Sequence, residues 1–182
     1  LSIAQSLYER HKALTYPRTD SRALPEDYVP VVKDTFTMLA DSGMKHLAPF
    51  AATAIKGGYV KPSKRIFDNT KVSDHFAIIP TLQAPRSLSE AEAKLYDMVV
   101  KRFLAVFYPP AEYMVTTRIT KVDLPAETHH FQTNGKVLVN PGWLAVYGKE
   151  AQDEDANLVP VKQGEQVRVE SVDVKALQTK PP

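Results

Sequence analysis

Cysteine is missing from this chain of 182 residues, which excludes a disulfide framework and any zinc ribbon built on thiolates. Long apolar runs are also missing. None reaches the roughly 18 residues of a membrane-spanning helix, and no signal peptide opens the chain, so we expect a cytoplasmic protein without a membrane partner. Neither charge dominates, because 23 Lys and Arg stand against 21 Asp and Glu. Contact with nucleic acid would therefore need local clusters of basic residues.

Helical periodicity dominates the first part of the chain. Apolar spacing predicts helices over residues 1–13, 27–41 and 47–55, and the polar stretch 59–73 is typical of a loop. The clearest helix begins at Ser89, which forms a capping box with Glu92, and it ends before Pro109. Its apolar positions predict a face packed in a core.

After Pro110 the pattern alternates as in strands. Strands are predicted over residues 113–119, 128–133, 137–139 and 167–174, and Asn134-Gly135 predicts a hairpin turn between two of them. The acidic residues 150–155 are typical of a solvated loop. These patterns predict an α+β protein, with a mainly helical domain over 1–110 and an antiparallel β domain over 111–182.

The segment 14–25, which reads LTYPRTDSRALP, has the residues for attack on a phosphodiester. Pro17 and Pro25 keep it out of a regular helix. Tyr16 offers an oxygen nucleophile, and the planar guanidinium of Arg18 can bind two phosphate oxygens. Tyrosine and arginine at this spacing alone would more often be an ordinary loop pair.

Two further segments strengthen this interpretation. Residues 74–81 read DHFAIIPT, and residues 140–147 read NPGWLAVY. With the segment 14–25, they make the chain resemble the type IA DNA topoisomerases, in particular the topoisomerase III branch. Position 74 is Asp where this family usually has Ala. The resemblance implies that residues 1–110 are most of the tyrosine-bearing domain III and that residues 111–182 are part of domain II, the arch of the toroid.

The resemblance also implies roles for individual residues. Tyr16 would attack the DNA strand, Arg18 would stabilise charge on the phosphate, and His75 would bind a phosphate oxygen or orient the acid at the leaving group. Supporting or DNA-binding roles would fall to Thr19, Asp20, Ser21, Lys61, Lys64, Arg65, Lys71 and Thr81. Two of these assignments have structural alternatives: Asp20 and Ser21 can simply hold a turn, and the basic residues can form a solvated face.

The same resemblance places the metal outside this chain. Family members bind Mg²⁺ through an acidic cluster on a TOPRIM domain, and no strand here carries an Asp-x-Asp-x-Glu pattern. We therefore expect no metal site in this chain, and we expect a fragment that lacks the TOPRIM and helical domains and is inactive alone. Its expected partner is single-stranded DNA. Relaxases and tyrosine recombinases need histidine or arginine patterns that are not present. A non-catalytic module that binds single-stranded DNA is the alternative.

Overall fold

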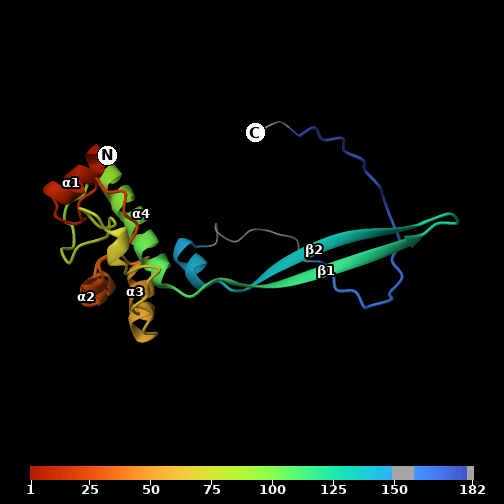
Figure 1. The fold of residues 1–182 in the computed structure, drawn as a ribbon, viewed down its shortest axis with the longest axis horizontal. Helices are drawn as coiled ribbons and strands as arrows, with labels where there is room; N and C mark the ends of the chain where they lie inside the picture. The colour runs from red at the N-terminus through yellow and green to blue at the C-terminus, as the bar shows by residue number, and fades with distance from the viewer. Residues whose placement is uncertain (149–157, 180–182) are drawn as a thin grey trace.

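The computed structural model describes residues 1–148 and 158–179. Figure 1 shows helices gathered at one end of the molecule and a long two-stranded hairpin that projects away from them. This arrangement agrees with the α+β class predicted from the sequence. The elements are, in chain order, α1 (Ser2–Glu9), η1 (Glu26–Tyr28), α2 (Val29–Ala40), α3 (Ala48–Lys56), η2 (Asn69–Lys71), α4 (Glu90–Phe107), β1 (Glu112–Asp123), β2 (Thr128–Asn140) and η3 (Gly142–Tyr147).

Helix α4 is the centre of the helical unit, and its capping box is confirmed. The Glu92 amide donates to Ser89 Oγ at 3.3 Å, and the Ser89 amide donates to Glu92 Oε2 at 2.8 Å. The buried face of α4 packs its aromatic rings on α2, where Phe36 lies 5.1 Å from Phe103 and 5.4 Å from Phe107 between ring centroids. The predicted apolar face is therefore core.

The hairpin differs from the predicted one. β1 and β2 pair without a break at residues 134 and 135, where Asn134 lies opposite Thr117, and the turn is at 124–127, where the Leu124 amide donates to the Glu127 carbonyl at 2.8 Å. The predictions of a turn at 134–135 and of two separate strands around it are wrong. Pairing continues through this point, where Thr117 Oγ1 donates to Asn134 Oδ1 at 3.1 Å. Pro125 falls in the actual turn, where no ladder hydrogen bond is needed.

The strand predicted over 167–174 is also wrong, because residues 158–179 contain no strand. The valines of this segment are exposed, with 87% of Val174 accessible to solvent. An extended segment needs a neighbouring strand for its amides and carbonyls, and among the described residues none lies beside it. The predicted acidic loop at 150–155 lies outside the described residues.

The base of the hairpin is fastened to the helical unit at Gly142. This residue has φ +49°, and a Cβ there would lie 2.3 Å from the Pro110 carbonyl oxygen, so only glycine fits without a backbone shift. The Trp143 amide donates to the Pro109 carbonyl at 2.9 Å, and Leu144 and Val146 are buried as η3 packs against α4. The third sequence motif thus returns the chain to the helices.

Candidate active site

The two segments that the motifs singled out run side by side. Helix α1 ends at Glu9, earlier than predicted, and the chain then turns into residues 13–15, which pair antiparallel with residues 79–81. The Thr15 amide donates to the Ile79 carbonyl, and the Thr81 amide donates to the Ala13 carbonyl, both at 3.0 Å. This short ladder brings the segment of His75 to the segment of Tyr16.

Two threonine hydroxyls reinforce the ladder. Thr15 Oγ1 donates to the Ala77 carbonyl at 3.1 Å and accepts the Ile79 amide at 2.9 Å. Thr81 Oγ1 donates to the Lys12 carbonyl at 2.5 Å. Lys12 has φ +53°, a conformation that non-glycine residues seldom adopt, so this bond helps to hold the turn that ends α1. The hydroxyl proposed from the sequence as a phosphate contact, that of Thr81, is therefore already bonded within the protein.

The Tyr16 ring contacts two other aromatic rings. Its centroid is 4.1 Å from that of His75, with the planes inclined by 36°, and 5.4 Å from that of Tyr8, with the planes at 82°. Tyr16 is half-buried, whereas His75 is exposed. The structure thus brings together two of the three residues predicted to be catalytic and leaves the imidazole open to solvent.

The residues that follow Tyr16 divide into two kinds. Arg18 and Asp20 are exposed, and Asp20 belongs to none of the ion pairs found among residues 1–148 and 158–179. Thr19 Oγ1 instead donates to the His75 carbonyl at 3.1 Å, and Ser21 Oγ donates to the Lys71 carbonyl at 2.8 Å. These two hydroxyls bond the Tyr16 loop to residues 71–75.

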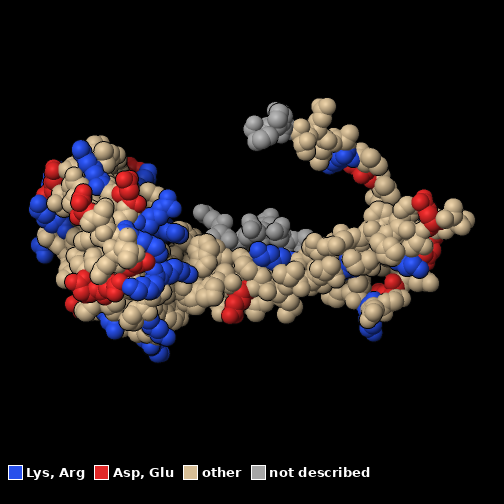
Figure 2. Space-filling model, viewed as in Figure 1, with Lys and Arg blue, Asp and Glu red and all other residues tan. Residues whose placement is uncertain are grey.

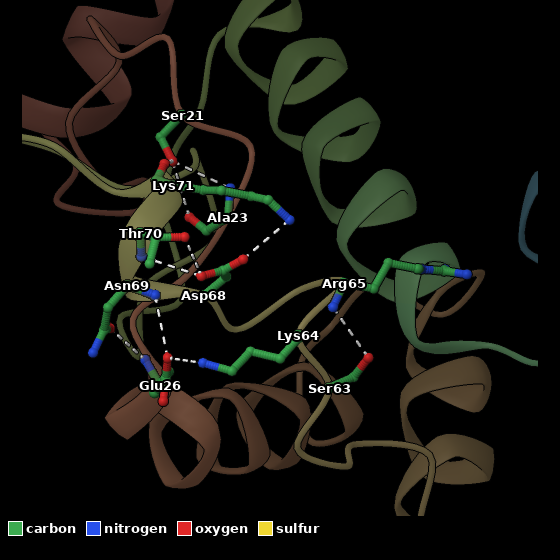
Figure 3. A network of polar contacts seen from close by, with 10 residues as sticks. All are labelled: Ser21, Ala23, Glu26, Ser63, Lys64, Arg65, Asp68, Asn69, Thr70 and Lys71. Carbon is green, nitrogen blue, oxygen red and sulfur yellow. Dashed lines mark hydrogen bonds and ion pairs between the residues drawn. The ribbon is translucent and has the colours of Figure 1, made fainter.

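The basic residues 61–71 are partly neutralised. In Figure 3, Lys64 reaches Glu26, and Lys71 reaches Asp68 with Nζ and Oδ2 3.1 Å apart. Arg65 donates to the Val106 carbonyl at 3.3 Å, while Lys61 is exposed. Figure 2 shows that most lysine and arginine side chains on the visible face cover the helical unit rather than the hairpin. The positive charge visible in this view therefore lies mostly on the helical unit.

These contacts also lower the pKa values of two carboxyl groups. Hydrogen bonds from the Thr70 hydroxyl and from Lys71 lower the pKa of Asp68 to about 2, and the hydrogen bond from Lys64 lowers the pKa of Glu26. The lysine cations thus have ionised partners at neutral pH. A phosphate would have to compete with these carboxylates for Lys64 and Lys71.

A polar cluster links α1 to α4. Glu92 Oε1 accepts from Ser6 Oγ at 2.6 Å and lies 3.2 Å from His11 Nε2. The Ser6 hydroxyl and the Ser89 amide are the main causes that lower the pKa of Glu92 to about 2, and His11 adds to them. Glu92 therefore stays ionised and serves both the capping box and the contact between the helices.

Three residues near Tyr16 carried no assignment from the sequence: Tyr8, Lys12 and Thr15. Lys12 Nζ lies 5.8 Å from the Tyr8 ring centroid, although Lys12 follows the end of α1 and is not part of the helix. The role of Thr15 has no signal in the sequence because its partners are more than 60 positions away.

The described part of the chain has no group of three or more His, Cys, Asp or Glu side chains placed to hold a metal ion. Among the helices of residues 1–148 and 158–179, none is both long and apolar enough to span a bilayer.

Comparison with known proteins gives one family. The family model described as DNA topoisomerase matches residues 1–182. The chain is 42% identical to the DNA topoisomerase 3 of Bacillus licheniformis, 41% to that of Bacillus subtilis and 37% to that of Shouchella clausii, with 100% of the chain covered each time. It spans 24–25% of the length of these relatives. The chain belongs to this DNA topoisomerase family, as the three motifs predicted.

Proposed function

We propose that the full-length protein carrying this chain is a type IA DNA topoisomerase of the topoisomerase III kind. It would cleave one DNA strand through Tyr16, pass another strand through the gap and reseal the first. The observation that carries the proposal is the ladder between residues 13–15 and 79–81, which stacks the His75 ring on Tyr16 at 4.1 Å. Family membership and the names of the relatives support the same reaction.

The chemistry is a transesterification. The Tyr16 phenol oxygen attacks phosphorus, the bond from phosphorus to the 3′-oxygen breaks, and a 5′-phosphotyrosine forms. The phenol loses its proton, and the released 3′-oxygen gains one. Because one phosphodiester replaces another, resealing needs no ATP. Arg18, exposed on the same loop, is free to meet the charge that builds on the phosphate oxygens.

His75 would assist the attack by Tyr16 through contact with the substrate or with the acid at the leaving group. Its ring packs against Tyr16, yet the residue is exposed, so the imidazole can meet a phosphate oxygen or the acid at the leaving group. Thr19 supports it indirectly by donating to the His75 carbonyl at 3.1 Å. Asp20 stays a candidate for orienting Arg18, since both are exposed on one loop.

The remaining parts of the site belong to the rest of the protein. Residues 1–110 form most of the tyrosine-bearing domain, and residues 111–182 form part of the arch domain. Mg²⁺ and the acid at the leaving oxygen belong to a TOPRIM domain beyond this chain, so the chain alone is inactive. The substrate is DNA that is single-stranded at the cleavage point, and the enzyme works in the bacterial cytoplasm.

The test compares the full-length protein with its Tyr16→Phe variant. A labelled oligonucleotide and Mg²⁺ should give a covalent band on a denaturing gel with the parent and none with the variant, while both bind the oligonucleotide equally. The chain alone should give no band. If the parent binds single-stranded DNA but neither cleaves nor relaxes it, the protein is a binding module instead.

A further inference from the structure

We infer that Tyr8 is a positioning residue that holds the phenol of Tyr16 in the orientation needed for attack. The inference rests on the proposed role of Tyr16 as the nucleophile. Tyr8 need not touch DNA for this role, because it acts through the ring of Tyr16. The supporting geometry is the edge-to-face contact between the two rings, with centroids 5.4 Å apart and planes at 82°.

The two rings that contact Tyr16 come from different kinds of segment. One is His75, an exposed residue on a loop, which a bound phosphate can engage. The other is Tyr8, which belongs to α1. Edge-to-face pairs at this distance are favourable beyond the area they bury. Tyr8 therefore provides the contact that comes from a regular element rather than a loop.

Helix α1 is itself well fixed. Leu7, next to Tyr8, is fully buried, and Ser6 donates to Glu92 of α4 at 2.6 Å. Lys12 Nζ lies 5.8 Å from the Tyr8 ring centroid, a cation–π contact on the ring. The position of Tyr8 is therefore fixed by the packing of α1 in the core and by the contact of Lys12 with its ring.

Orientation matters because attack needs the phenol oxygen at roughly 3–3.5 Å from phosphorus and in line with the leaving oxygen. A tyrosine side chain that loses one flanking ring can sample other rotamers, so the attacking geometry is populated less often. The loss should appear in the rate of cleavage at saturating DNA and not in DNA affinity. If Tyr8 only covered the surface of α1, its replacement would change neither the cleavage rate nor the DNA affinity.

The experiment uses the full-length protein and three variants. Tyr8→Ala removes the ring, Tyr8→Phe keeps it, and Tyr59→Ala removes a half-buried tyrosine whose edge-to-face partner is Tyr108, at 5.1 Å, away from the site. Single-turnover cleavage of a labelled oligonucleotide, its Kd and the melting temperature are measured for each. We expect Tyr8→Ala to cleave about 10-fold more slowly with an unchanged Kd. Tyr8→Phe and Tyr59→Ala should cleave like the parent.

Each other outcome has a definite meaning. Cleavage by Tyr8→Ala at the parent rate overturns the inference, as does an equal slowing in Tyr59→Ala, which would trace the effect to general destabilisation. Slow cleavage by Tyr8→Phe would show that the hydroxyl, not the ring, matters, and would also overturn it. The covalent product is mapped in the same samples. An adduct on Tyr16 at the parent rate in Tyr8→Ala removes only this inference, whereas an adduct elsewhere removes the proposed function.

Discussion

Replacing Thr15 with valine should loosen the ladder that brings His75 to Tyr16. The two side chains have the same shape, but valine can neither donate to the Ala77 carbonyl nor accept the Ile79 amide. Ile79 is only 5% exposed, so its amide would be left without a partner, at a cost of roughly 1–3 kcal/mol. The half-buried Ala77 carbonyl would lose a bond worth about 0.5–1.5 kcal/mol.

Together these losses amount to roughly 2–4 kcal/mol, or a fall in melting temperature of roughly 5 to 15 °C for a domain of this size. Thermal unfolding of the Thr15→Val chain by circular dichroism measures the fall. In the full-length protein, the same change should slow oligonucleotide cleavage because His75 is no longer held against Tyr16. Thr15→Ser keeps the hydroxyl and should stay close to the parent in both assays. A Thr15→Val protein that melts and cleaves like the parent would refute this reasoning.

Three further predictions concern other parts of the structure. His75→Ala in the full-length protein should slow cleavage by roughly 100-fold with little loss of DNA affinity; normal cleavage with a lower melting temperature would mean a structural histidine. Gly142→Ala should destabilise the chain by about 2 kcal/mol or more in urea unfolding, because its Cβ would lie 2.3 Å from the Pro110 carbonyl oxygen, whereas Gly43→Ala, with no atom within 4 Å of the added Cβ, should not. Stability should be fully present above about pH 4.5 and fall toward pH 2, because hydrogen bonds lower the pKa of Glu92 from 4.5 to about 2, and Glu92→Gln should flatten that fall.

Local signals predicted the helices well. The capping box at Ser89 and Glu92 and the prolines after α4 are neighbours in the sequence, and the structure uses them as expected. The turn signal at Asn134-Gly135 did not predict the actual turn. It is a local preference, and it lost to a register in which β1 and β2 pair continuously and in which Pro125 occupies the turn.

The sequence motifs name candidate residues but do not show how these residues are arranged. Family motifs pointed to Tyr16 and His75, but their ring contact depends on a ladder between segments more than 60 positions apart. The sequence does not indicate the contact of Tyr8 with Tyr16, because helical spacing alone indicates a face and not what that face touches. The sequence shows a group of basic residues at 61–71, but it does not show that Lys64 and Lys71 face Glu26 and Asp68.

The most direct test of the account is to identify the amino acid that carries the DNA. The full-length protein is mixed with an oligonucleotide and Mg²⁺, denatured during cleavage and digested, and the peptide linked to the nucleotide is sequenced by mass spectrometry. We expect a 5′-phosphate joined to Tyr16, within the peptide that also contains Pro17. A nucleotide joined to Tyr113 or Tyr147 would contradict it, and so would normal DNA relaxation by Tyr16→Phe.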